Sequence, residues 1–189
     1  VADPDKAIIA APMLTGAELH RILDEWNATQ TAAPLEQCLH RLIEAQTART
    51  PHTTAVIAGN ERLTYAELNG RANQLARYLR SLGVGPEVLV GICMERTSAM
   101  LVGMLGILKA GGAYVPLDPH YPQERIAYMV EDAHAPVLLT QRSLKDGLSP
   151  TAARVVCIDA DGDAIAGHAA DDLIGGATAG NLAYVLFTS

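Results

Sequence analysis

From about residue 51 onward, short apolar runs that are typical of buried strands alternate with segments that carry apolar residues at helical spacing. This alternation constrains the fold more than any other feature of the chain. Strands without a polar face belong to sheets that are covered on both sides, and strand–helix–strand repeats produce parallel sheets. The pattern therefore predicts an α/β fold with a mostly parallel sheet and flanking helices.

The individual elements follow from the same pattern and from turn residues. Strands are expected at residues 54–58, 62–63, 88–93, 113–117, 137–140, 155–158 and 182–187. Helices are expected at about residues 16–26, 34–46, 65–82, 98–110, 122–131 and 143–148, and residues 160–180 are expected to form a Gly- and Asp-rich loop.

Local signals fix several helix ends. Thr15-Gly16-Ala17-Glu18 and Thr64-Tyr65-Ala66-Glu67 are capping boxes, in which a hydroxyl and a carboxylate satisfy free amides at the helix start. Pro34 is expected to open the second helix, and Thr97 or Ser98 to cap the fourth. Gly83 lies where a helix would end in the left-handed conformation.

The chain divides into two parts of different character. Residues 1–50 look like helices joined by Pro-containing turns, whereas residues 51–189 carry the α/β pattern. A length of 189 residues leaves room for one domain of ordinary size. We therefore expect a helical linker at 1–50 followed by one domain, and a start at Val1 rather than Met suggests an excerpt.

Charge and composition exclude several classes of protein. A net charge of −7 argues against a nucleic-acid binder, which needs a basic face for phosphates. The longest apolar run, 99–108, ends at Lys109, well short of the ~20 residues of a membrane span. The 3 cysteines form no Cys-x-x-Cys pair, so a reducing cytoplasm fits, and Cys93 and Cys157 are expected to be core thiols.

A metal site is not expected. Asp159, Asp161 and Asp163 resemble the start of a calcium loop, but Ala164 and Ala170 stand where such a loop needs Gly and Glu. A solvated surface loop is the preferred interpretation, and the scattered histidines lack ligand spacing.

Ligands in open α/β sheets bind beyond the carboxyl ends of strands, and this rule selects the candidate residues. Glu95-Arg96 follows one strand but is more typical of a helix-starting surface pair. Lys109 could contact a phosphate. A structural role is preferred, because a Lys in the last turn of a helix already interacts favourably with the helix dipole. Thr188-Ser189 ends the last strand with two hydroxyls and two amides, the start of a phosphate cradle if a glycine-rich loop follows.

Three segments resemble the core motifs of nonribosomal peptide synthetase adenylation domains, which are members of the AMP-binding, acyl-adenylate-forming superfamily. Leu63-Thr64-Tyr65-Ala66-Glu67-Leu68 is similar to the first motif, and residues 108–118, Leu-Lys-Ala-Gly-Gly-Ala-Tyr-Val-Pro-Leu-Asp, to the second. Residues 182–189 resemble the first half of the third, which continues in the family as a Lys-containing phosphate loop.

The sequence upstream fits the same resemblance. Leu23-x-x-Trp26-Asn27-x-Thr29 is similar to the linker between a condensation domain and an adenylation domain. Ala33 departs from the family, in which an aromatic residue often precedes the proline. The resemblance covers about residues 20–189 and implies the N-terminal part of the adenylation fold at 51–189, cut off within the phosphate loop.

The resemblance implies ATP-dependent activation of an amino acid. The product is an aminoacyl adenylate, which passes to the phosphopantetheine thiol of a peptidyl carrier domain, with Mg²⁺ accompanying the ATP. Only Thr188 and Ser189, at the start of the ATP phosphate loop, are carried over as binding residues, and no catalytic residue lies in this chain. We therefore expect the 189 residues alone to be inactive.

Two other functions stay open. One alternative is an acyl- or aryl-CoA ligase, which belongs to the same superfamily. The sequence of Ala113–Asp118 and the Trp26-Asn27 linker favour a peptide synthetase instead. Residues 1–50 could instead dock a neighbouring domain as a non-catalytic interaction module. An unrelated nucleotide-binding fold lacks support, because neither Gly-x-Gly-x-x-Gly nor a complete Walker sequence occurs. A chain that stops after an apolar strand is also expected to be poorly soluble.

Overall fold

The computed structural model describes residues 13–30 and 36–188, and its contacts divide the chain into two units, Val1–Pro34 and Leu35–Ser189. In the first unit, helix α1 (Gly16–His20) continues as one π-helical turn, η2 (Arg21–Glu25), which ends at Trp26. The capping box is confirmed, since Thr15 Oγ1 accepts from the Glu18 amide and the Glu18 carboxylate accepts from the Thr15 amide.

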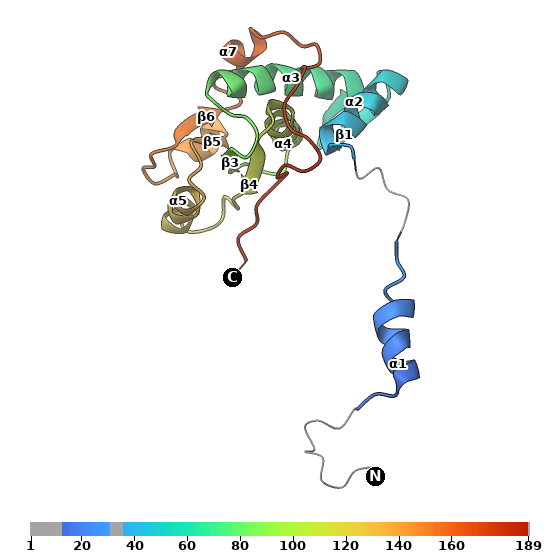
Figure 1. Ribbon diagram of the computed structural model, residues 1–189. Coiled ribbons are helices and arrows are strands. Elements are labelled where there is room, and N and C mark those ends of the chain that lie inside the picture. The colour runs from blue at the N-terminus through green and yellow to red at the C-terminus, as the bar shows by residue number, and fades with distance from the viewer. Residues whose placement is uncertain (1–12, 31–35, 189) are drawn as a thin grey trace. The chain divides into compact units, whose positions relative to one another are not determined.

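The second unit contains the α/β fold (Figure 1). Its helices are α2 (Leu39–Arg49), α3 (Tyr65–Ser81), α4 (Ser98–Ala110), α5 (Gln123–Asp132), α6 (Arg142–Lys145) and α7 (Gly162–Ala166). Its strands are β1 (Thr54–Ala58), β2 (Glu61–Thr64), β3 (Leu89–Ile92), β4 (Ala113–Pro116), β5 (Val137–Thr140) and β6 (Arg154–Cys157).

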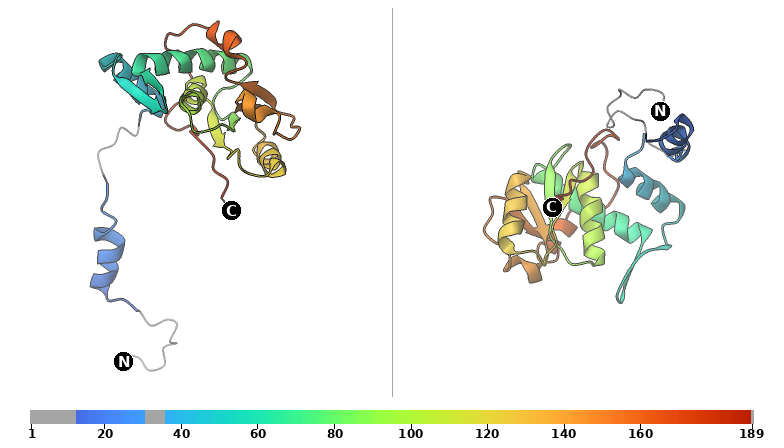
Figure 2. Two further views of the ribbon diagram at one scale, coloured as in Figure 1. Left: turned by 180° about the vertical axis from the view of Figure 1, so that it is seen from behind. Right: turned by 90° about the horizontal axis from the view of Figure 1, so that it is seen from below.

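The described residues form two sheets, and the larger one is parallel as predicted. Strands β4-β3-β5-β6 pair in that order with all strands parallel, and β1 and β2 form a separate antiparallel hairpin. Helices α3 and α4 cover one face of the parallel sheet and α5 covers the other (Figures 1 and 2). The predicted α/β class with flanking helices is therefore confirmed.

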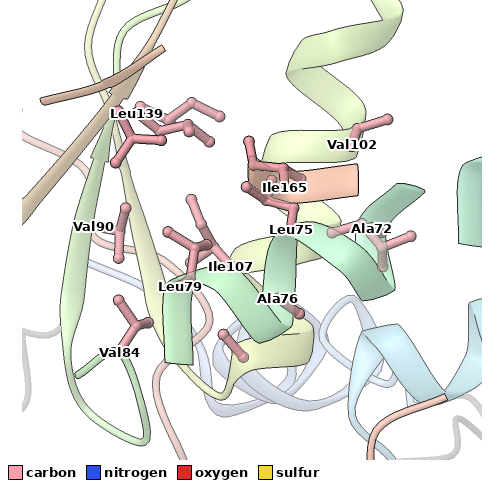
Figure 3. Close-up of a cluster of buried hydrophobic side chains, with 14 of the residues drawn as sticks. Ala72, Leu75, Ala76, Leu79, Val84, Val90, Val102, Ile107, Leu139 and Ile165 are labelled. Atoms are coloured by element: carbon pink, nitrogen blue, oxygen red, sulfur yellow. The ribbon is translucent and has the colours of Figure 1, made fainter. Parts of the chain in front are cut away.

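The main core lies between the α3–α4 layer and the parallel sheet (Figure 3). Leu75 and Leu79 of α3 are fully buried, as expected of a helix that carries apolar residues at helical spacing. Helix α4 is apolar on nearly every side because it lies between α3 and the sheet. Gly106 permits this, since a Cβ there would lie 2.7 Å from Leu75 Cδ2. The missing side chain at Gly106 thus lets the two helices approach closely.

The predicted strand at 182–187 is wrong. Only one isolated bridge forms, between Tyr184 and Tyr114 of β4, with Tyr114 N donating to Ala183 O and Val185 N to Tyr114 O. A parallel ladder would next use the N–H groups two residues either side of Tyr114. Gly112 N donates instead to Ile107 O, closing helix α4, and Pro116 has no N–H. The ladder is therefore cut short at both ends.

Two further expectations are corrected. The expected loop at 160–180 contains helix α7, held by the buried side chain of Ile165. Thr97 occupies the N-cap position of α4 without a capping hydrogen bond, because its hydroxyl lies 3.4 Å from Glu95 O. The Ser98 hydroxyl does not cap either, since it donates to the Glu61 carboxylate.

The remaining helix ends differ by small amounts from the prediction. Pro34 lies outside the described residues, and α2 begins at Leu39, after a turn and bend at 36–37. Helix α6 spans Arg142–Lys145 rather than 143–148. Gly83 has a φ of +89°, which confirms its left-handed conformation after α3. No helix among residues 13–30 and 36–188 combines the length and the apolar character that a membrane crossing requires.

Candidate functional site

A cleft of about 690 Å³ opens at the carboxyl ends of β3 and β4. The chain leaves β3 toward α4 on one face of the sheet and leaves β4 toward α5 on the other face. Such a switch point leaves a crevice between neighbouring strand ends, where ligands bind in open α/β sheets. Residues that line the cleft are Ile92, Met94, Glu95, Arg96, Thr97, Met100, Pro116, Leu117, Asp118, Pro119, His120, Tyr121, Met129, Leu186 and Phe187.

The turn after β3 forms one wall of the cleft and is anchored to β5. Thr140 Oγ1 donates to Cys93 O at 2.8 Å, and the Glu95 amide donates to Gln141 Oε1 at 2.8 Å. Glu95 and Arg96 are exposed at this wall, so the structure places the pair beside the cleft. Burial raises the pKa of the Cys93 thiol to about 11, as suits the predicted core thiol.

The turn after β4 forms the opposite wall. The Asp118 carboxylate accepts from the His120 amide at 2.9 Å and lies 2.9 Å from its ring Nδ1. The hydrogen bond from the His120 amide, and to a smaller extent the hydrogen bond with the His120 ring, hold the pKa of the Asp118 carboxyl below its usual value. The rule that ligands bind beyond strand ends points to Asp118. Nothing in the sequence indicated that His120 binds Asp118, because this contact depends on how the turn folds.

Segment 182–188 runs beside the free edge of β4 and reaches the cleft. The rings of Tyr184 and Tyr114 stack with centroids 5.7 Å apart, and Leu186 and Phe187 line the cleft. Thr188 follows directly and is exposed, whereas Ser189 lies outside the described residues. The structure therefore brings the end of this segment to the strand-end walls that hold Glu95 and Asp118.

Lys109 is not part of this cleft. Its side chain is 1% exposed, and its ammonium pairs with the Glu44 carboxylate and lies 3.3 Å from Asp172 Oδ1. The expected structural role agrees with these contacts, although the partners are two carboxylates, one nearly buried on Glu44 and one half-exposed on Asp172, rather than the helix dipole alone. Sequence reasoning had no signal for Glu44 or Asp172 as its partners.

The acidic residues near the end of the chain bind backbone amides. Asp159 Oδ1 accepts from the Arg142 amide and Asp161 Oδ2 from the Cys157 amide, both at 2.8 Å. Among the described residues, no group of three or more His, Cys, Asp or Glu side chains is arranged to hold a metal ion.

Comparison with known protein sequences gives consistent matches. A family model described as AMP-binding enzyme matches residues 43–189. The chain is 49% identical over 189 residues to a linear gramicidin synthase of Brevibacillus parabrevis, covering 100% of this chain and 4% of that protein. It is 46% identical over 192 residues to chondramide synthase cmdD of Chondromyces crocatus, covering 100% and 5%. The chain thus spans only a small fraction of these relatives' lengths.

Solved structures share the fold. The nonribosomal peptide synthetase FmoA3 in its AMPPNP-bound form matches with a TM-score of 0.82 and 36% identity, over 90% of this chain and 18% of that one. The N-terminal subdomain of Klebsiella oxytoca NpsA matches with a TM-score of 0.70 over 82% of this chain and 39% of its own. The latter is 22% identical and supports the fold alone.

Proposed function

The chain belongs to the AMP-binding enzyme family, and from this premise we propose that it is the amino-terminal portion of an adenylation domain in a nonribosomal peptide synthetase. The whole protein activates an amino acid with ATP, giving an aminoacyl adenylate and pyrophosphate. The aminoacyl group then passes to the phosphopantetheine of a carrier domain. Identities of 43–49% to peptide synthetases favour this function over an acyl- or aryl-CoA ligase.

The observation that carries the proposal is the path of segment 182–188 into the cleft at the switch point. Exposed amides and hydroxyls beyond a strand end are the usual partners of phosphate oxygens. Thr188 stands where the chain leaves this strand-end cleft, and Ser189 follows it in the sequence, so we assign both to the start of the ATP phosphate loop. ATP, accompanied by Mg²⁺, is the substrate that this assignment requires.

Amino-acid-dependent exchange of pyrophosphate into ATP tests the proposal. We expect the whole protein to catalyse the exchange with one amino acid from a panel, and the 189-residue chain alone to give none. In the whole protein, Thr188→Ala removes one hydroxyl from the phosphate contacts and is expected to slow the exchange by at least about tenfold.

Thr151→Ala is the matched control, because this partly exposed Thr lies in the turn before β6 and outside the cleft. It is expected to leave the exchange rate unchanged. Exchange by the isolated chain, or a Thr188→Ala protein as active as the control, would contradict the assignment. A whole protein that exchanges with no amino acid but ligates a fatty or aryl acid to coenzyme A would identify the alternative ligase.

The linker supports a role for residues 1–50 in binding the neighbouring condensation domain, which we propose as the upstream partner. Leu19, Leu23 and Trp26 follow one another at steps of four and three, and each is a large exposed hydrophobic residue. In a pull-down with the condensation domain as bait, the double variant Leu23→Ser, Trp26→Ser is expected to lose binding. Ile57→Ser, at an exposed position on β1, is the control that should bind normally, and equal binding by both variants would refute the docking role. The boundary near residue 50 stays a prediction, as does the cytoplasmic location.

A further inference from the structure

Residues 166–176, which we call the strap, leave α7 and run along helix α3 toward the start of segment 177–188 (Figure 1). The strap was expected to be a plain polar loop. Leu173 is 6% exposed and belongs to the main core, so the strap is tied into the fold at its middle. What holds the rest of the strap is a row of polar side chains from α3.

These side chains lie on one face of α3 and donate to backbone carbonyls of the strap. Their spacing of one, three and three residues keeps them on adjacent helical positions. The hydrogen bonds are Gln74 Nε2 to Ala166 O and His168 O, Arg77 to Ala169 O and Asp171 O, Asn73 Nδ2 to Ala170 O, and Arg80 to Ile174 O and Gly175 O. The strap is therefore bound along its length through its main chain.

Asp172 adds a charged anchor in the middle of the strap. Its Oδ1 accepts from Asn69 Nδ2 at 2.8 Å and Asn73 Nδ2 at 3.0 Å, and it lies 3.3 Å from Lys109 Nζ. Partial burial alone would raise the pKa of this carboxyl, but the two amide donors and the Lys109 charge outweigh it and hold the pKa below its usual value. The ionised carboxylate is thus the form that this pocket stabilises.

The same residues connect the strap to the beginning of β4. Lys109 stands in the last turn of α4, just before β4, and Arg80 donates to Lys109 O and Ala110 O as well as to the strap. Gly176, with a φ of +117°, passes so close that a Cβ would lie 2.8 Å from Arg80 Nη2. The start of β4 and the end of the strap are therefore held at one point.

This point lies upstream of both partners in the bridge between β4 and segment 182–188. The bridge itself consists of two backbone hydrogen bonds, from Tyr114 N and Val185 N, so it fixes the register only weakly. Asn181 and the Leu182 amide both donate to Glu87 Oε1, which adds one more tie before the bridge. Where Thr188 arrives at the cleft therefore depends on where the strap ends.

We propose that Asp172 is a positioning residue for nucleotide binding: by holding the strap on Lys109, Asn69 and Asn73, it places segment 182–188, and with it Thr188, at the cleft. The proposal rests on the proposed contact of Thr188 and Ser189 with ATP phosphates. Asp172 itself is not among the residues that line the cleft. Its effect on ATP is transmitted through the position of the chain.

Asp172→Asn in the whole protein tests this proposal, with Asp171→Asn as the matched control. The asparagine keeps the shape of the anchor but loses the charge-assisted part of three interactions. The Asp171 carboxylate is 75% exposed and pairs only with Arg77 at the surface, where an ion pair contributes little. Asn69→Ala, which removes one donor to Asp172, is a milder variant that keeps the test available if Asp172→Asn does not fold.

The readouts are ATP affinity by calorimetry and hydrogen exchange of the peptide that spans 177–188. For Asp172→Asn we expect ATP binding about tenfold weaker, a KM for ATP raised by a similar factor with kcat changed much less, and faster exchange in 177–188. Asn69→Ala should shift both readouts in the same direction by a smaller factor. Asp171→Asn should match the unmodified protein.

Two results would overturn the positioning role: normal ATP affinity in Asp172→Asn despite faster exchange in 177–188, or equal losses in Asp171→Asn and Asp172→Asn. Failure of the proposed function looks different. In that case the unmodified protein itself neither binds ATP nor exchanges pyrophosphate, whereas failure of the positioning role leaves the unmodified protein fully active.

Discussion

Replacing Lys109 by methionine is expected to lower the free energy of unfolding by about 3 kcal/mol, because it leaves the carboxylates of Glu44 and Asp172 without their cation. The Glu44 side chain is only 11% exposed, so water replaces little of the lost interaction. Methionine keeps the unbranched apolar stem of lysine, which limits any loss of packing. Urea unfolding at low micromolar concentration, followed by far-ultraviolet circular dichroism, measures the change.

Lys145→Met is the matched control for this experiment. Lys145 is exposed in the last turn of α6, so the same substitution there should change the free energy of unfolding by no more than about 0.5 kcal/mol. A loss below about 1 kcal/mol in Lys109→Met would show that groups other than Lys109 stabilise the Glu44 and Asp172 carboxylates.

Replacing Leu75 by alanine is expected to cost about 3 kcal/mol, the second large effect. Leu75 of α3 is fully buried against α4, and removal of its isopropyl group leaves a cavity beside Gly106. Leu101→Ala on the outer side of α4 is the control, since Leu101 is 44% exposed and should lose about 1 kcal/mol or less. The same urea experiment compares the two proteins.

The close contact between Leu75 and Gly106 allows a second test of the same packing. Gly106→Ala alone places a methyl group 2.7 Å from Leu75 Cδ2 and 2.9 Å from Cγ, so it should destabilise by about 1–3 kcal/mol despite the better helix propensity of alanine. In Leu75→Ala, Gly106→Ala the new methyl enters the cavity. The double variant should therefore lose less than the sum of the single losses, and strict additivity would contradict this packing of α3 on α4.

Local signals in the sequence predicted the elements well. The capping boxes at Thr15 and Thr64 form with the hydrogen bonds that their residue types imply, and the apolar stripe of α3 faces the core. The capping boxes and the apolar stripe each depend on residues that lie a few positions apart, so they can be predicted from the sequence. The helix in the Asp-rich region was missed because it is held by the buried Ile165 side chain and by the hydrogen bond from Gln74 to Ala166 O, which are tertiary contacts that local propensity does not encode.

The candidate site was predictable only in part. The strand-end rule selects Glu95 and Thr188, but the strand order, which places β3 between β4 and β5, is needed to bring Glu95 and the residues just before Thr188 to one cleft. The strap was beyond sequence reasoning for a different reason. Asn69 and Asp172 are 103 positions apart, and most other strap contacts use carbonyl oxygens, which every residue possesses.

Because the strap is bound mainly through its carbonyl oxygens, the two sides of this contact differ in how many substitutions they tolerate. The α3 side recognises the strap through specific amide and guanidinium groups, so Asn73, Gln74, Arg77 and Arg80 have few acceptable substitutes. The strap accepts these hydrogen bonds with main-chain carbonyl oxygens, which are present whatever the side chain is. Most strap positions other than Asp172, Leu173, Gly175 and Gly176 are thus free to exchange residues, and the region suits loop grafting provided that its length is kept.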